Sequence, residues 1–169
     1  MGSKRIGLAR TQALIENLKR ELDWNGATLT DVAALTTTGA VTAGTSITAT
    51  SGDITLTSGM VEYADGGAVT QGTSKSTTVV LSKPTGKITM HAAALAADAI
   101  VTFTVTNTHA RATDVVVVNH HSGGTVGAYT VQATGHAAGS FKITVTNVSA
   151  GSLSEALVLH YVLVKTAHT

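Results

Sequence analysis

Residues 140–148, SFKITVTNV, alternate apolar and polar side chains with a period of two. In an extended chain this spacing places three apolar side chains on one face, those of Phe141, Ile143 and Val145. Residues 99–107, AIVTFTVTN, repeat the same alternation. Both stretches are therefore predicted to be β-strands with one buried face and one face in water.

Eight stretches with strand-like composition follow one another between residues 61 and 169, separated by turn sequences such as HSGGT and SAGSLS. They cover residues 68–71, 77–82, 86–91, 99–107, 113–120, 126–134, 140–148 and 155–165. Short strands at such regular intervals predict an antiparallel β-sandwich with a jelly-roll or immunoglobulin-like topology. VVVV and ALVLHYVLV are apolar on both faces, so we expect these strands to be central in a sheet or to contact another subunit.

The composition of the whole chain predicts a mainly β protein. The 169 residues include 30 threonines, 17 glycines and one proline, a mixture typical of short strands joined by turns. The net charge of +1 disfavours nucleic acid as the main partner, because such surfaces need a clear cationic excess. We expect no membrane span and no export signal, since no apolar run is long enough. The absence of cysteine excludes disulfides and thiolate metal sites and suits folding in a reducing cytoplasm.

A short repeat occupies residues 35–60, as LTTTGA, VTAGTS, ITATSGD and ITLTSGM. The units open at Leu35, Val41, Ile47 and Ile54. A period of six to seven residues is a short strand plus a tight turn, as in solenoids and fibre shafts, where each rung buries one aliphatic side chain. Four rungs make little more than one coil of a single-chain solenoid, which cannot shield its own interior. Three chains around one axis turn the same rungs into complete layers, so the repeat predicts a homotrimeric shaft with these four residues in its core.

The first part of the chain is predicted to be helical. Residues 3–23, SKRIGLARTQALIENLKRELD, carry an apolar stripe at alternating spacings of three and four, and Asn25-Gly26 supplies a stop signal. A lone helix of this length is marginal in water, so we expect it to pack on copies of itself, on another protein or on its own domain. We therefore divide the chain into a helical anchor at 1–26, a β-repeat shaft at 27–60 and a β-sandwich head domain at 61–169.

Catalytic and metal-binding patterns are weak throughout. The adjacent His120 and His121 point to opposite faces of a strand and cannot both bind one metal, although trimer symmetry leaves open a metal on the axis with one histidine from each chain. Ser122 lies in no nucleophile-elbow pattern. A glycan-cleaving site would need two facing carboxylates; Glu62 and Asp65 are close in sequence, but they sit beside DGG, a sequence typical of a loop. We expect no catalytic residue, no cofactor and no metal.

Several segments resemble a known group of proteins. MGSKRIGLARTQALIENLKREL at the start, and GKITMHAAALAADAIVTFTVTN, ATDVVVVNHHSGGTVGAY and GSFKITVTNVSAGSLSEALVLHYVLVK near the end, resemble small virion structural proteins from tailed phages of marine bacteria. The threonine- and glycine-rich repeat between them resembles phage fibre shafts in general. The resemblance implies a virion component assembled in the host cytoplasm, but not its position in the particle.

Two functional hypotheses follow. The first is a non-enzymatic, trimeric protein that decorates the capsid or forms a head fibre. Its N-terminal segment is basic and amphipathic. This segment would contact the capsid or another virion protein through Lys4, Arg5, Arg10, Ile15 and Leu18. The alternative is a tail fibre or spike that binds a host surface glycan or receptor, although the predicted sandwich has few aromatic residues for stacking on sugars.

Overall fold

The structure is a computed structural model that describes residues 37–44, 46–51 and 53–166. The chain divides into two units between Thr55 and Leu56. All strands of the described residues lie in the second unit, and the described residues contain no helix. The predicted anchor at 1–26 and Leu35 of the predicted shaft lie outside the described residues.

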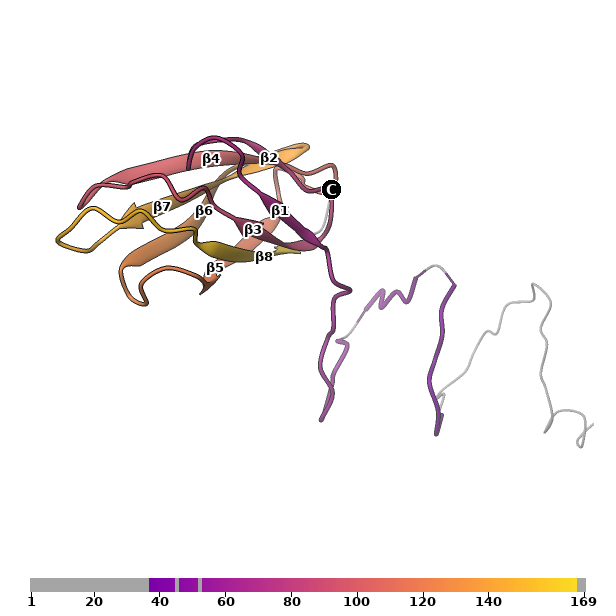
Figure 1. The fold of residues 1–169 in the computed structure, drawn as a ribbon. Coiled ribbons are helices and arrows are strands. Elements are labelled where there is room, and N and C mark those ends of the chain that lie inside the picture. The colour runs from indigo at the N-terminus through magenta and orange to yellow at the C-terminus, as the bar shows by residue number, and fades with distance from the viewer. Residues whose placement is uncertain (1–36, 45, 52, 167–169) are drawn as a thin grey trace, which may run out of the picture. The chain divides into compact units, whose positions relative to one another are not determined.

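Eight β-strands form the second unit (Figure 1). They are β1 (Ala68–Thr70), β2 (Val79–Val80), β3 (Thr85–Thr89), β4 (Ile100–Thr106), β5 (Val115–Ser122), β6 (Tyr129–Ala137), β7 (Ser140–Asn147) and β8 (Val158–Val164). Each of the eight predicted stretches overlaps one of these strands. The prediction of a mainly β protein is confirmed.

The strands form two four-stranded sheets packed face to face (Figure 1). Sheet A has the order β1-β3-β8-β5, and sheet B has the order β2-β4-β7-β6. The strand β8, which is apolar on both faces, is central in its sheet. This is one of the two positions that we expected for such a strand. The doubly apolar β5 is instead an edge strand, with Val115 and Val117 exposed by 50% and 55% in the single chain.

The prediction of purely antiparallel sheets is wrong, because each sheet contains one parallel pair. Strand β1 pairs parallel to β3, and β2 pairs parallel to β4. Between β1 and β3 the chain crosses to sheet B to form β2, and between β2 and β4 it crosses to sheet A to form β3. A crossover returns the chain in the same direction, whereas only a hairpin reverses it.

The alternating residues of β4 and β7 behave as their sequence predicts. Phe141, Ile143 and Val145 are fully buried between the sheets, together with Phe103 and Val105 of β4. The intervening threonines lie on the outer face of sheet B, where the hydroxyl groups of Thr102 and Thr144 hydrogen-bond across the two strands at 2.9 Å. This division into an apolar inner face and a hydroxyl-rich outer face is the main source of stability for the sandwich.

The sequence TVTN ends both of these strand segments, and both asparagines are fully buried. Asn147 donates from Nδ2 to three backbone carbonyl oxygens, of Leu95, Ala96 and Gly151, at 2.8, 3.0 and 2.8 Å. Its Oδ1 accepts from the backbone N–H of Ser149 at 3.0 Å. These bonds tie the loops at Leu95–Ala96 and at Gly151 to the end of β7.

Asn107 closes the loops at the end of β4 in the same manner. Its Nδ2 donates to the carbonyl oxygen of Lys83 at 2.7 Å and to the hydroxyl oxygen of Tyr161 at 3.2 Å, and its Oδ1 accepts from the backbone N–H of His109 at 2.9 Å. Tyr161 in turn donates to the carbonyl oxygen of Leu81 at 2.9 Å. Its ring packs edge-on against Phe141 in the core, with ring centroids 5.2 Å apart.

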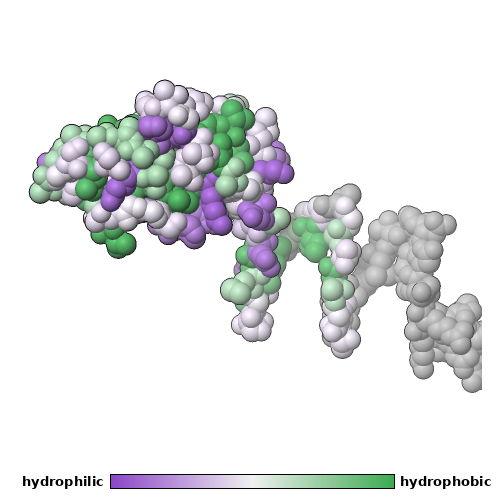
Figure 2. Space-filling view, in the orientation of Figure 1, coloured by the Kyte–Doolittle hydropathy of each residue, from purple (hydrophilic) through white to green (hydrophobic). Residues whose placement is uncertain are grey.

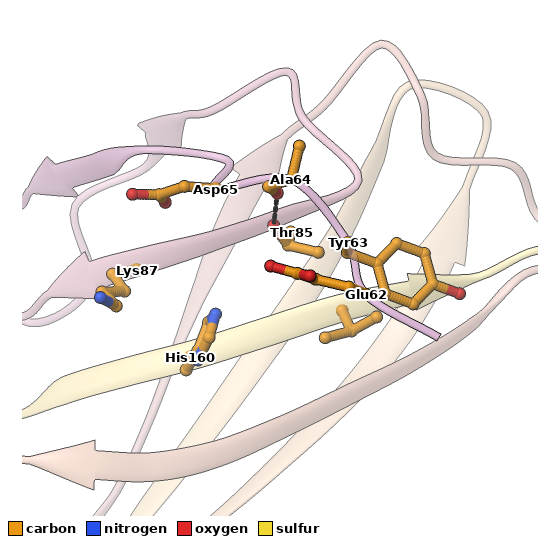
Figure 3. A pocket seen from close by; sticks show the side chains of 8 residues that line it. Glu62, Tyr63, Ala64, Asp65, Thr85, Lys87 and His160 are labelled. Atoms are coloured by element: carbon orange, nitrogen blue, oxygen red, sulfur yellow. Dashed lines mark hydrogen bonds between the residues drawn. The ribbon is translucent and has the colours of Figure 1, made fainter. Parts of the chain in front are cut away.

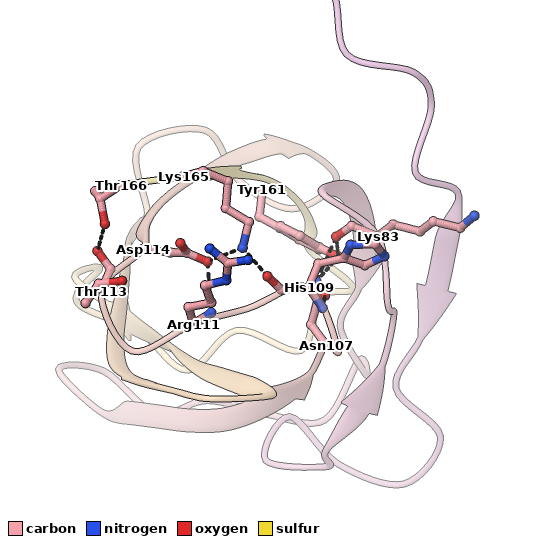
Figure 4. A network of polar contacts seen from close by, with 9 residues as sticks. All are labelled: Lys83, Asn107, His109, Arg111, Thr113, Asp114, Tyr161, Lys165 and Thr166. Carbon is pink, nitrogen blue, oxygen red and sulfur yellow. Dashed lines mark hydrogen bonds and ion pairs between the residues drawn. The ribbon is translucent and has the colours of Figure 1, made fainter. Parts of the chain in front are cut away.

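An ion pair joins the start of β5 to the end of β8 in sheet A (Figure 4). Lys165, just after β8, contacts the Oδ2 atom of the buried Asp114, just before β5, at 2.5 Å. The backbone N–H of Arg111 donates to the same oxygen at 2.8 Å. The hydrogen bond from Lys165 is the main reason that the pKa of Asp114 lies below its ordinary value.

The described residues that precede β1 form no strand in the single chain. Three of the four predicted shaft-core residues are described, and all three are exposed: Val41 by 59%, Ile47 by 67% and Ile54 by 68%. On the visible face of the sandwich, green apolar patches alternate with pale and purple ones (Figure 2). Within the described residues, no helix has the length and apolarity needed to cross a membrane.

We expect Asn147→Ala to lower the free energy of unfolding by about 2–4 kcal/mol, because a fully buried side chain is lost together with its hydrogen bonds to three loop carbonyls and to the backbone N–H of Ser149. Urea unfolding of the full chain measures the change. The matched control is Asn119→Ala on the exposed side of β5, which should change the value by no more than about 0.5 kcal/mol. A loss for Asn147→Ala as small as that of the control would contradict the role assigned to this side chain.

We expect the free energy of unfolding to decrease as the pH is lowered from about 5 to about 2. The pKa of Asp114 is lowered in the folded state, so its stabilising effect is present above the unfolded-state pKa and is lost as the pH falls through the folded-state value. Lys165→Met removes the main cause of the lowered pKa and should make unfolding less dependent on pH in this range. Urea unfolding at each pH tests this, with Lys142→Met on β7 as the control. A decrease equally steep in Lys165→Met and the parent would refute the assignment.

Candidate functional site

A groove of about 390 Å³ lies on the outer face of sheet A (Figure 3). One side is formed by residues 62–65, which precede β1, and the rest by outward-facing residues of β3 and β8. Apart from Tyr63, four ionisable side chains line it: Glu62, Asp65, Lys87 and His160. Both acidic and basic groups therefore face one hollow.

The sequence Asp65-Gly66-Gly67 holds residues 62–65 against the sheet. A Cβ atom on Gly66 would lie 1.4 Å from the backbone oxygen of Thr85, so only glycine allows this approach. Gly67 has a φ of +82°, a left-handed conformation that also favours glycine. The Asp65 Oδ1 atom accepts from the backbone N–H of Gly67 at 2.9 Å, and Thr85 donates from its hydroxyl to the carbonyl oxygen of Ala64 at 3.0 Å.

Strand register brings the other lining residues together. Lys87 of β3 lies directly opposite His160 of β8, and Thr85 lies opposite Val162. On both strands these positions alternate with buried core residues, so their side chains point to the outer face. Lys87, His160 and Val162 are half-buried, which leaves part of each side chain open to the groove.

The ionisable side chains of the groove do not neutralise one another. Within the described residues the one ion pair is that between Lys165 and Asp114, away from this site. The hydrogen bond drawn between lining residues in Figure 3 joins Thr85 and Ala64. Glu62 is exposed, and Asp65 uses one carboxylate oxygen for its local turn. Donors and acceptors therefore remain available to a ligand.

The two adjacent histidines contact different partners, as the strand alternation predicts. The ring of His120 packs edge-on against Tyr129 of β6, with centroids 6.0 Å apart. The ring of His121 packs edge-on against His160, with centroids 5.5 Å apart. Only His121 therefore lies next to the groove. Within the part of the chain that the structure describes, no cluster of three or more metal-ligating residues is present.

Asp114, His120 and Ser122 have the residue types of a catalytic triad, but the fold separates Asp114 from the other two. Asp114 precedes β5, whereas His120 and Ser122 lie at its far end. Six residues of extended strand from Asp114 to His120 span about 20 Å, so these groups do not form one site.

A second polar cluster is structural. The buried Lys75 donates from Nζ to the carbonyl oxygens of His91 and Glu155. Burial is the main reason that the pKa of Lys75 is lowered. The Glu155 carboxylate accepts from the backbone and hydroxyl of Thr125 and from the Tyr129 hydroxyl, and the Thr125 bonds lower its pKa. The pKa of Tyr129 is raised to about 12, mainly because its hydroxyl is buried and secondly because it donates a hydrogen bond to Glu155. These groups tie loops to the core and are already fully engaged.

The sequence indicated only part of the groove. Glu62 and Asp65 stand out as neighbouring carboxylates, but their DGG context is that of an ordinary loop. Lys87 and His160 carry no motif, and the available signal is their outward position on alternating strands. The predicted anchor residues Lys4, Arg5, Arg10, Ile15 and Leu18 lie outside the described residues.

Comparisons with known proteins find no matching family model, no similar curated protein and no similar solved structure. A function for the chain therefore has to be inferred from its sequence pattern, its fold and the chemistry of its surfaces.

Proposed function

We propose that this chain is a non-enzymatic structural protein of a bacteriophage virion. In this proposal it is a homotrimer that decorates the capsid or forms a head fibre, and its N-terminal segment attaches it to the particle. The shaft joins copies of the chain, and the β-sandwich is the head domain. The protein would be assembled in the host cytoplasm and reside in the virion.

The exposed apolar residues of the repeat carry this proposal. Val41, Ile47 and Ile54 recur at six- to seven-residue spacing and are between 59% and 68% exposed in the single chain. Regularly spaced aliphatic side chains that no described residue of their own chain covers are typical of surfaces buried between subunits. Three copies around an axis would bury all of them in successive layers.

The edge of sheet A supports contacts between copies in the head domain as well. Val115 and Val117 of β5 are about half exposed, and Val164, the register partner of Val115, continues the apolar surface onto β8. Because β5 is an edge strand, one side of its backbone is also available for pairing.

For the head domain we propose a jelly-roll rather than an immunoglobulin-like topology. The antiparallel pairs β3–β8 and β4–β7 are nested in the sequence. Each step from β1 to β6 crosses to the opposite sheet. Nested pairs with repeated crossing between sheets are typical of jelly-rolls, whereas immunoglobulin-like domains contain successive strands within one sheet.

A tail fibre or spike that binds a host surface glycan or receptor is the second candidate. The groove on sheet A favours it, because a purely structural head domain needs no hollow lined by unpaired ionisable groups. This candidate shares the trimeric architecture and differs in the part of the particle to which the chain attaches.

Ile47→Asp should weaken trimer association by at least about tenfold, because three carboxylates would then crowd one apolar layer. Light scattering across a dilution series measures the association. The control is Thr48→Asp, which adds the same charge at the neighbouring, polar position of the repeat. Equal association of Ile47→Asp and the parent would exclude Ile47 from a shaft core, and a parent chain that stays monomeric at micromolar concentration would exclude the trimer.

Deleting residues 2–24 should abolish attachment to virions that lack the protein, while circular dichroism still shows a folded β domain. The segment combines the chain's main cluster of positive charge with an apolar stripe. Two further variants separate these contributions: Lys4, Arg5 and Arg10 changed to glutamine, and Ile15 and Leu18 changed to serine. Salt should weaken only the charge-dependent part, since exposed charges are screened over about 10 Å at 0.1 M. Full occupancy by the truncated protein would place the anchor elsewhere.

A further inference from the structure

The groove on the outer face of sheet A has the chemistry of a small ligand site. We propose that it binds a sugar residue that is either uncharged or carries an amino group. Ligand binding goes beyond the proposed structural role. It does not require the proposed trimer, because all the lining residues belong to one chain and one unit. It holds wherever the protein sits in the virion.

The size of the groove suits a small saccharide. Its volume of about 390 Å³ lies near the lower end of the range for small-molecule sites, which is roughly 300–1,000 Å³. About one or two sugar rings fit such a volume. Its rim of residues 62–65 is fixed by Gly66 and by the Thr85 hydrogen bond to Ala64, so the hollow exists before a ligand arrives. A preformed site binds without the cost of ordering a loop.

The hydrogen-bonding groups match a polyhydroxylated ligand. Glu62 and the second oxygen of Asp65 are acceptors, Lys87 is a donor, and His160 has two ring nitrogens of opposite character when neutral. Each sugar hydroxyl both donates and accepts, so one ring satisfies groups of both kinds at once. Such charge-assisted hydrogen bonds are the stronger class in proteins.

Two apolar surfaces complete the site. Tyr63 on the rim is 46% exposed, and Val162 of β8 is half-buried in the floor. The faces of a sugar ring present C–H groups, which pack against aromatic and aliphatic side chains and release water. The paucity of aromatic residues in the chain therefore does not exclude sugar binding, because one of its three tyrosines stands at the groove.

The charge of the groove sets the class of sugar. Two carboxylates against one lysine leave a net charge of −1 when His160 is neutral. An acidic sugar would meet this excess negative charge, whereas an amino sugar would gain an attraction to Glu62 or Asp65. The site therefore prefers uncharged and amino sugars over uronic acids.

Saturation-transfer difference NMR on the full chain tests the proposal, with methyl glucoside, glucosamine and glucuronic acid as probes at millimolar concentration. We expect transfer to the first two sugars, with a Kd on the order of 1 mM, and much weaker transfer to the third. Glu62→Gln should weaken glucosamine binding about tenfold. Lys87→Met should weaken binding of both sugars by a similar factor.

The matched control is Lys142→Met, which removes an exposed lysine from the outer face of sheet B and should leave binding unchanged. Absence of transfer to methyl glucoside and glucosamine would overturn the proposal, as would glucuronic acid binding as tightly as glucosamine. Equal weakening by Lys142→Met and Lys87→Met would overturn the assignment of the groove. Light scattering of the same samples reports the trimer separately, so failure of sugar binding and failure of the proposed assembly are distinguishable.

Discussion

The closed form of the β-sandwich depends on hydrogen bonds from two fully buried asparagines to carbonyls of the adjoining loops. Asn147 donates to three such carbonyls, and Asn107 links the loop at Lys83 to the hydroxyl of the core residue Tyr161. The apolar core packs between two sheets whose connecting loops are held in place at both of these points. The repeated TVTN sequence is thus a structural device: its valine enters the core, and its asparagine closes the adjoining loops.

Close backbone contact has a comparable role on the outside of sheet A. Gly66 lets the chain touch the backbone of β3, and this contact fixes the rim that makes a flat sheet face into a groove. Glu62 and Asp65 are held on one side of the hollow while Lys87 and His160 rise from its floor. The groove is therefore a product of main-chain geometry. Apart from the Asp65 oxygen that accepts a hydrogen bond in its own turn, its ionisable side chains have none of the structural bonds that Asp114, Lys165 and Glu155 make.

The sandwich and the repeat differ in how far their apolar side chains are buried within one chain. The sandwich buries its aliphatic and aromatic residues within one chain, whereas Val41, Ile47 and Ile54 stay exposed in that chain. In the proposed trimer, copies of the chain would bury these residues of the repeat, whereas the sandwich is complete in one chain. A ligand groove on the complete part would add recognition to that assembly without depending on it.

The sequence by itself determined the strands, the two faces of β4 and β7 and the separation of His120 from His121, because a period of two is a local property of an extended chain. Its four repeat rungs also predict that the repeat does not form a closed core alone. Only the tertiary structure decided that β1 and β2 pair in parallel, that the apolar β5 is an edge strand and that residues 62–65 meet β3 and β8. Strand partners and directions depend on the path of the chain between the sheets, and the same alternation is compatible with either direction of pairing. The groove joins residues almost a hundred positions apart, from Glu62 to His160. Local periodicity predicts that Lys87 and His160 point outward, but it does not predict that Glu62 and Asp65 lie beside them.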